Sequence, residues 1–229
     1  MTDPVSLSDS LHACLIGDTW VLLQTVQDRY FVLTGHQARW FSEIAAGTPR
    51  ALCPQAAAFE ERLCARGILP RPLPAGHQIA EPGEAGSFEN LPETPGAPIR
   101  LQDAALFTRT FLALCHLQDP KRRRLDRLLA SARRWKDGAR RRRRAETANT
   151  ACLTRTFHAL TPWFFSSHDA CFFRSLMLVR FLSRYGIAAD WTFGVRVSPF
   201  RAHCWVTCEG YLLTEDRDSV AGYRPILTV

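Results

Sequence analysis

The sequence predicts an α+β fold built from two modules. Three observations support this prediction: strand-like and then helical patterns in the first 74 residues, a Pro-, Gly- and Glu-rich segment at 75–98, and helical patterns followed by strand-like ones after it. With 229 residues, 46% of them hydrophobic and 22% charged, the chain is long enough to bury a core. We therefore expect one module at 1–74, a linker at 75–98 and a second domain at 99–229.

The first module is expected to be a small winged-helix-like unit of three strands and two helices. Three short extended segments are expected at 12–16, 19–25 and 29–33, and the two later ones are rich in β-branched and aromatic residues, which favour strands. Apolar positions then recur at helical spacing over 35–46, and Gly47 suits the residue just beyond a helix. A second helix is expected to begin near Pro54 and to stop at Gly67.

The second domain is expected to begin with helices and to finish as an antiparallel sheet. Helical patterns cover 101–118 and 121–136. The stretch from Asp169 to Tyr185 is apolar nearly all round, which predicts a helix buried in the core. Strand-like segments follow it, with Glu209–Gly210 as a hairpin turn between the last two: 191–197, 203–207 and 211–214.

Positive charge is concentrated in one segment of the chain. Residues 121–144 hold thirteen Lys or Arg and two Asp, within a net charge of +7 for the whole chain. A DNA-reading helix should be basic, and neither 35–46 nor 54–66 is, so a nucleic-acid partner is not expected. No apolar run reaches the ~18 residues of a membrane helix, and the start lacks a secretory signal. We expect a cytoplasmic protein.

Eight cysteines form no convincing disulfide or metal-binding set. No C-x-x-C pair occurs, and nothing points to an exported protein, so reduced and buried thiols are expected. Cys204 and Cys208 flank a strand and should lie roughly 13 Å apart at ~3.3 Å per residue. That separation is too large for a tetrahedral zinc site. No metal site is expected.

Cys171 is the residue best placed for chemistry. Asp169 is a suitable N-cap and would put Cys171 at the second position of its helix. Free N–H groups and the positive end of the helix dipole favour a thiolate there, and the same donors suit a developing oxyanion. The competing interpretation is that Cys171 is simply the first core residue of an apolar helix.

A histidine and two carboxylates follow in a suggestive order. His203 begins a strand 32 residues after Cys171 and could act as its base. The group that orients the imidazole should come from the strand paired with His203, and that strand ends in Glu215 and Asp216. A cysteine at a helix start, a histidine on a strand and an acid on the next strand predict a Cys-His-acid catalytic centre.

The residues around these positions resemble the B protein of lasso-peptide biosynthesis. The similarity covers roughly 140–229 and rests on segments in matching order: 171–176 (CFFRSL), 184–187 (RYGI), 194–195, 199–200, 202–206 (AHCWV) and Gly210. It implies a papain/transglutaminase-like cysteine protease that removes a leader peptide, with Cys171 as nucleophile and His203 as base. The family's acid is usually an Asp twelve residues after the histidine. Here that register gives Glu215, and Asp216 is the alternative.

The first module is similar to the leader-recognition element of systems that modify ribosomal peptides. The similarity rests on residues 28–33 (DRYFVL), 38–40 and Gly47. It implies that a leader peptide adds as a strand to the sheet edge and packs against the following helix. The candidate groove residues lie at 22–27 and on the first helix, and those singled out are Leu22, Leu23, Gln24, Thr25, Arg39, Trp40 and Glu43.

The resemblance also implies partners. The substrate would be a precursor peptide, and this chain would need no cofactor, because a separate asparagine-synthetase-like cyclase would use ATP. Segment 121–144 is compatible with docking to that cyclase, an acidic leader, a membrane surface or a transporter. Three alternatives stay open: an acyltransferase or transglutaminase with the same triad, a non-enzymatic nucleic-acid binder, and an inactive scaffold in which Glu215 replaces the usual Asp.

Overall fold

The computed structural model describes most of the chain in eight stretches: residues 5–8, 10–46, 53–69, 88–92, 98–118, 124–142, 147–164 and 171–229. By its contacts the chain divides into two compact units. Unit 1 comprises Met1–Gly86, Gly194–Ala202 and Tyr223–Thr228, and unit 2 comprises Ser87–Phe193, His203–Gly222 and Val229. The domain boundaries expected from the sequence stay predictions.

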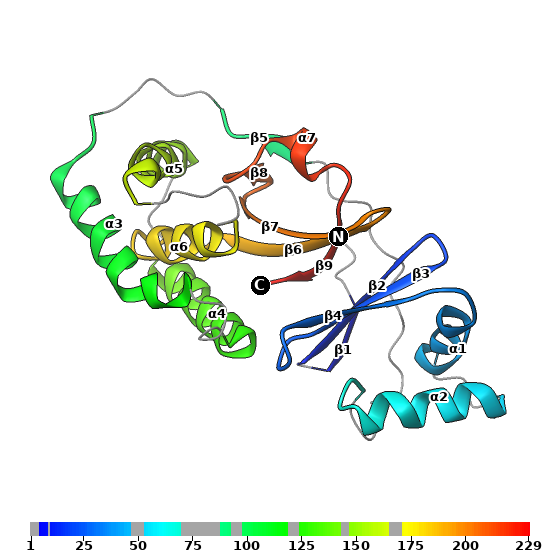
Figure 1. Cartoon of the computed structure of the whole chain (residues 1–229). Coiled ribbons are helices and arrows are strands. Elements are labelled where there is room, and N and C mark those ends of the chain that lie inside the picture. Colours follow the sequence, from blue (N-terminus) through cyan, green and yellow to red (C-terminus); the bar gives the residue numbers. More distant parts are fainter. Residues whose placement is uncertain are drawn as a thin grey trace. The chain divides into compact units, whose positions relative to one another are not determined.

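Unit 1 contains a four-stranded antiparallel sheet in the order β1-β2-β3-β4 (Figure 1). Its strands are β1 (Val5–Ser8), β2 (Leu11–Ile16), β3 (Thr19–Gln24) and β4 (Arg29–Leu33). The last three are the strands predicted from the sequence, and β1 adds a fourth beside β2. The register pairs Trp20 with Leu33 and Leu22 with Phe31, so these side chains line one face.

Two helices follow this sheet, as predicted. Helix α1 (Gly35–Ala45) buries Ala38, Phe41 and Ile44, the apolar stripe expected from the sequence. The indole N–H of Trp20 donates to Ser42 Oγ at 2.8 Å and ties α1 to β3. Helix α2 (Pro54–Ala65) begins with proline at its first position, where the missing N–H costs nothing. The chain leaves α2 through Gly67, which has a φ of +66° that favours glycine.

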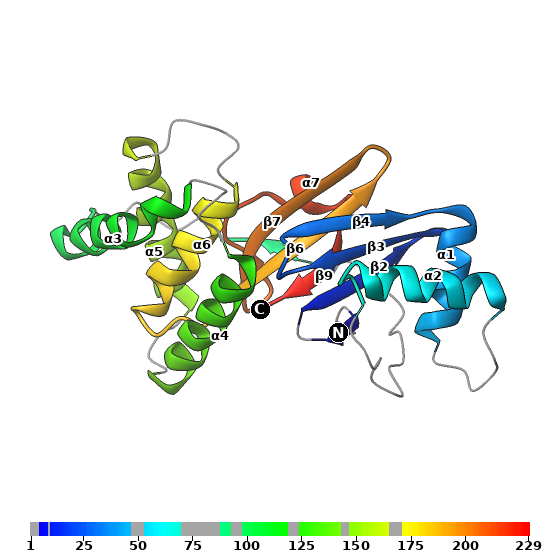
Figure 2. The same ribbon diagram turned by 60° about the horizontal axis from the view of Figure 1, so that its bottom comes forward.

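Four long helices form the first part of unit 2. They are α3 (Leu101–Leu114, extended by the 3₁₀ turn η1, Cys115–Gln118), α4 (Leu125–Arg142), α5 (Thr147–Leu160, followed by η3, Thr161–Trp163) and α6 (Cys171–Ser183). Helices α3, α4 and α5 all contact α6, which confirms the prediction of a central buried helix (Figures 1 and 2). Helix α4 runs beyond the predicted end at 136, and α5 was not predicted.

The second sheet is mixed rather than purely antiparallel, which corrects the sequence prediction. Its order is β5-β8-β7-β6-β9, with β5 (Glu89–Asn90), β6 (Asp190–Val197), β7 (Phe200–Cys208), β8 (Tyr211–Leu212) and β9 (Arg224–Thr228). Strand β5 lies inside the segment expected to be a linker, and it pairs in parallel with β8. The predicted hairpin turn is present, because Glu209 and Gly210 have φ values of 51° and 87°.

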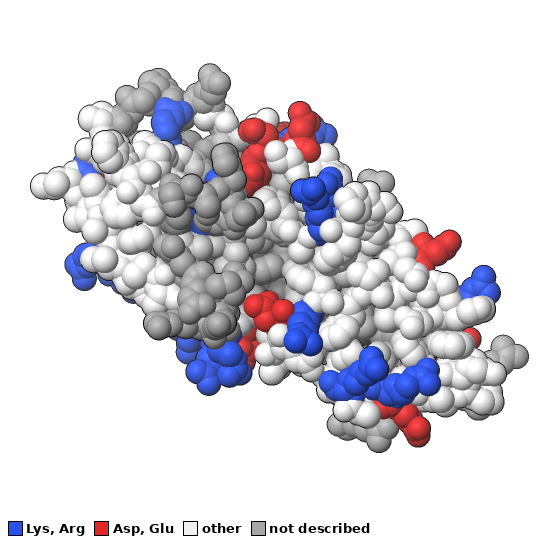
Figure 3. Space-filling view, in the orientation of Figure 1, with Lys and Arg blue, Asp and Glu red and all other residues white. Residues whose placement is uncertain are grey.

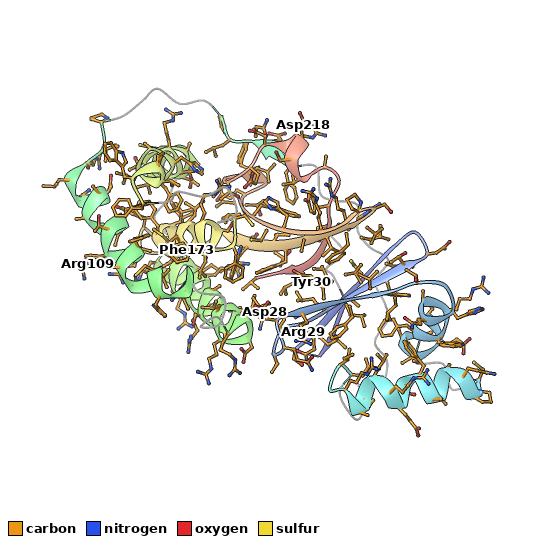
Figure 4. All side chains as sticks on the ribbon, viewed as in Figure 1. Asp28, Arg29, Tyr30, Arg109, Phe173 and Asp218 are labelled. Atoms are coloured by element: carbon orange, nitrogen blue, oxygen red, sulfur yellow. The ribbon has the colours of Figure 1, made fainter. Side chains whose placement is uncertain are left out.

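Aromatic rings fill the space between the helices of unit 2. Phe107 of α3 lies 5.1 Å from Phe157 of α5, centroid to centroid, and 6.3 Å from Phe181 of α6. Phe173, labelled on α6 in Figure 4, packs edge-on against Phe111 at 6.1 Å. These contacts fix α6 and hence the direction in which its first residue points. In the described residues no helix is both long and apolar enough to cross a membrane.

Candidate active site

The first turn of α6 meets the start of β7 and the loop after β8, all within unit 2. Cys171 is the first described residue of α6. The expected cap Asp169 lies outside the described residues, so the position of Cys171 counted from that cap stays a prediction. His203 comes from β7 and Glu215 from the loop between β8 and the short helix α7 (Arg217–Val220). The hairpin turn after β7 brings the acid back beside the histidine.

The structure brings Glu215, and not Asp216, to the histidine. His203 Nε2 lies 3.6 Å from Glu215 Oε1, and these side chains are only 19% and 17% exposed. With Nε2 facing the acid, Nδ1 is the ring nitrogen left for the cysteine. Asp216 lies exposed at the N-cap position of α7, where its backbone is extended and begins the helix.

The thiol of Cys171 is surrounded by hydrogen-bond donors. The Cys204 thiol, the His203 ring and the Cys204 backbone N–H all donate to it, and together they lower the pKa of Cys171 to about 4 despite the opposing effect of burial. The same contact with Cys171, helped by Glu215, raises the pKa of His203 to about 9. At pH values between about 4 and about 9, Cys171 and His203 therefore form a thiolate–imidazolium pair.

Cys204 belongs to the site, although strand alternation gave no reason to place it there. The residue is buried, and its Sγ lies 3.8 Å from Ser175 Oγ on α6. The Ser175 hydroxyl in turn donates to the Cys204 carbonyl at 3.3 Å. The hydrogen bond to Cys171, followed by burial, raises the pKa of Cys204, so this thiol keeps its proton and serves as a donor.

Arg174 is a second residue of the site that sequence reasoning missed. It lies one helical turn after Cys171, and its guanidinium Nη2 donates to Glu215 Oε1. Burial raises the pKa of Glu215, but the contact with the His203 ring and the charge of Arg174 outweigh it, so the pKa falls below its usual value. The motif CFFRSL contains Arg174, but a single sequence does not reveal a partner 41 residues away.

The loop that carries Glu215 is held from three other elements. His158 Nε2 on α5 lies 2.6 Å from the Leu213 carbonyl oxygen. The Val206 N–H of β7 donates to Thr214 Oγ1 at 3.0 Å. The Arg217 N–H donates to Asn90 Oδ1 of β5 at 3.0 Å, so the short strand in the expected linker also supports the acid.

A cavity of about 410 Å³ opens beside this loop. Helix α5 contributes Thr154, Arg155 and His158 to its wall, and the loop contributes the stretch from Leu212 to Asp216. The site therefore has open space next to the acid. Among the described residues, no group of three His, Cys, Asp or Glu could hold a metal ion.

The arrangement suits nucleophilic catalysis by a thiolate. A thiolate at the start of a helix is a good nucleophile, and an imidazolium beside it can protonate a leaving group. Backbone N–H groups in the first turn of a helix have no partner within the helix, so those of α6 could stabilise a developing oxyanion.

The predicted leader-binding residues fall into two groups. Strand β3 pairs with β2 on one side and β4 on the other, so its backbone is satisfied. Its residues and the following one are buried: Leu22, Leu23, Gln24 and Thr25. These four side chains do not line an exposed groove in this structure, and their role in leader binding stays a prediction. The helical candidates on α1 are accessible, with Arg39 and Glu43 exposed and Trp40 half-buried.

The basic segment forms the outer face of α4. The opposite, apolar face of α4 is buried and consists of Leu125, Leu128, Leu129, Ala132 and Ala139. Seven arginines of this helix region are exposed: Arg124, Arg127, Arg133, Arg134, Arg140, Arg141 and Arg142. Figure 3 shows blue side chains gathered over α4, at the lower left of the view. The positive charge of α4 is thus exposed to solvent.

Comparison with known protein families finds a match for the second half of the chain. A family model described as the transglutaminase-like superfamily matches residues 113–228, which is 116 of the 229 residues. The match contains Cys171, His203 and Glu215. Comparison with curated proteins and with solved structures finds no match.

Proposed function

The chain belongs to the transglutaminase-like superfamily, and we propose that it is a cysteine peptidase that removes the leader from a lasso-peptide precursor. The observation that carries the proposal is the contact set of Cys171, His203 and Glu215 at the start of α6. The resemblance of segments 171–176 and 202–206 to lasso B proteins supplies the substrate class. We assign the nucleophile to Cys171, the acid–base role to His203 and the orienting role to Glu215.

The reaction has two halves. The Cys171 thiolate attacks the carbonyl carbon of the last leader residue, and the oxyanion forms near the N–H groups of α6. As the C–N bond breaks, the His203 imidazolium gives its proton to the departing amine of the core peptide. Water, deprotonated by His203, then attacks the thioester, and the thiolate leaves as the leader carboxylate forms. Glu215 keeps the ring oriented and offsets its charge in both halves.

The runner-up function shares the first half of this reaction. In an acyltransferase or transglutaminase an amine, rather than water, attacks the thioester, and the same three side chains serve both reactions. Incubation of protein and cognate precursor in ¹⁸O-labelled water, followed by mass spectrometry, separates them. Hydrolysis adds one ¹⁸O to the released leader, whereas transfer to an amine adds none.

The same assay tests the peptidase itself. We expect wild-type protein, with its cyclase present, to release a leader bearing one ¹⁸O. His203→Ala should lower the rate by roughly 10²–10⁴-fold, because the acid–base group is lost. His116→Ala is the matched control, since His116 lies in η1, outside the catalytic residues. Normal leader release by His203→Ala would contradict the assignment.

We further propose that the leader adds as a strand to β4, which ends the order of the unit 1 sheet. Helix α1 contacts β4 and would line the groove with Arg39, Trp40 and Glu43. Val32 on β4 is 41% exposed, and Val26 in the preceding turn is 50% exposed. Val32→Asp should weaken binding of a fluorescent leader peptide at least roughly tenfold, and Val26→Asp should not. Equal binding by both variants would exclude the β4 edge.

The exposed arginines of α4 are proposed to dock the asparagine-synthetase-like cyclase, which would supply the ATP-dependent step in the cytoplasm. Complementary charge would give an association that weakens with salt. Arg134→Glu with Arg141→Glu reverses two charges on one face of α4, about two helical turns apart. These changes should abolish co-elution with the cyclase while leaving Cys171 reactivity intact. Retained co-elution, or binding instead to anionic vesicles, would reject this docking site.

A further inference from the structure

Glu215 approaches His203 with a long and flexible side chain. A glutamate has one more rotatable bond than an aspartate, so holding its carboxylate at one ring nitrogen costs more conformational entropy. The 3.6 Å separation between Glu215 Oε1 and His203 Nε2 is also longer than a good hydrogen bond. A second contact is therefore needed to keep the carboxylate at the imidazole.

Arg174 makes that second contact with the same oxygen. Its Nη2 donates to Oε1 of Glu215, the atom that also faces His203. The two side chains of this ion pair are 30% and 17% exposed, so solvent screens it less than a surface pair. The contact joins α6 to the loop after β8 across 41 residues of sequence.

The position of Arg174 on α6 ties this contact to the nucleophile. Cys171 and Arg174 are three residues apart in one helix, so both side chains lie on the same face. The packed rings around Phe173 and Phe181 fix that helix in unit 2. One rigid element thus sets the distance from the thiolate to the histidine and the place of the acid behind it.

We propose that Arg174 is a positioning residue of the catalytic centre, which holds the Glu215 carboxylate against Nε2 of His203. The inference rests on the proposed roles of Cys171, His203 and Glu215, and it adds a fourth side chain to them. Arg174 donates to the carboxylate of Glu215, so the role assigned to it acts through the acid.

The sign of one pKa change distinguishes positioning from other roles. Glu215 and Cys171 raise the pKa of His203 to about 9. The charged groups that face Glu215 are Arg174 on α6, His203 on β7 and His158 on α5, whose own pKa is lowered chiefly by burial. Loss of Arg174 as a positioning group frees the carboxylate and lowers the pKa of His203. Loss of a mere positive charge near the site would raise it.

The experiment follows the imidazole of His203 by NMR in protein with ¹⁵N-labelled histidine. The signal is assigned as the one lost in His203→Gln. Arg174→Gln should move the titration midpoint down by about one unit. Because the imidazolium is then lost earlier as the pH rises, kcat/KM for the precursor should fall roughly tenfold above about pH 9 and change little at pH 7. Arg174→Lys keeps the positive charge but lacks the planar guanidinium group. Its His203 midpoint should lie between those of the wild type and Arg174→Gln.

A matched control comes from the same helix. Arg180 is half-buried and stacks over Trp135 at 4.8 Å, away from the acid, so Arg180→Gln should leave the His203 midpoint unchanged. Thermal unfolding of both variants checks that each is folded. A folded Arg174→Gln with an unchanged or raised midpoint overturns the proposal. A lowered midpoint without precursor cleavage by the wild type upholds the positioning role and rejects the peptidase function instead.

Discussion

Two cysteines, one in each unit, show how differently this chain treats the same side chain. Cys14 lies in β2 of unit 1, where burial raises its pKa to about 12 although the charge of Arg224 opposes this. Cys171 of unit 2 is also partly buried, yet its pKa falls to about 4. Burial therefore acts in the same direction on both thiols, and its effect is reversed at only one of them.

The difference lies in the donors around each sulfur. The Cys204 thiol, the His203 ring and a backbone N–H offer Cys171 three hydrogen bonds. Cys14 sits in a strand paired on both sides, within an apolar sheet core. Cys171 is therefore reactive because the first turn of α6 lies beside the hydrogen-bond donors of β7. The first sheet supplies a rigid scaffold with a sheet edge.

The largest expected difference between the two cysteines is in the rate of leader release after each thiol is removed. Cys171→Ala should abolish leader release, a loss of roughly 10³-fold or more, because the nucleophile is gone. Cys14→Ala should leave the rate unchanged and lower only the stability of unit 1. Mass spectrometry of the precursor measures both. Leader release by Cys171→Ala at the wild-type rate would remove the basis for the whole site.

A core substitution in the first sheet sharpens the comparison. Leu22 is fully buried in β3, and Leu22→Ala should cost about 2–5 kcal/mol of unfolding free energy through the cavity that it leaves. In protein that is still folded, the rate at which iodoacetamide labels Cys171 should not change. Denaturant titration and labelling kinetics check the two halves. Slower labelling of Cys171 in folded Leu22→Ala would mean that packing in unit 1 affects the reactivity of the thiolate.

A smaller effect tests the donors directly. Cys204→Ala removes the thiol that contributes most to the lowered pKa of Cys171, so that pKa should rise. Each unit of increase means about tenfold less thiolate below the new midpoint. Cys208→Ala, at the far end of the same strand, is the control. Labelling rates at pH 5 should fall in the first variant and not in the second.

Much of this fold follows from local patterns in the sequence. The stripe of Ala38, Phe41 and Ile44 predicted α1, and the all-apolar run after residue 170 predicted the central helix. Cys171 and His203 were singled out because a helix start and a strand start are readable from their neighbours. Helix α5 was not predicted because buried threonines, among them Thr150 and Thr154, occupy positions where an apolar stripe is expected.

The rest depends on contacts between distant segments. The register favours Glu215 but leaves Asp216 open, and only the path of the chain into α7 turns one toward His203 and the other outward. Strand β5 is two residues long and is stabilised by β8, not by its own composition. Likewise, β3 reads as a candidate edge until β1 and β4 are seen to extend the sheet on both sides of the β2–β3 pair.

The central claim is that Cys171 is a thiolate paired with the His203 imidazolium. Its most direct test is the rate of iodoacetamide labelling of Cys171 in the folded wild-type protein from pH 3 to 10, resolved by peptide mass spectrometry. Because the pKa of Cys171 is about 4, labelling should rise through that pH and already be fast at pH 6, where Cys14 stays unlabelled. A Cys171 rate that rises only near pH 9, as for an ordinary thiol, would contradict the account.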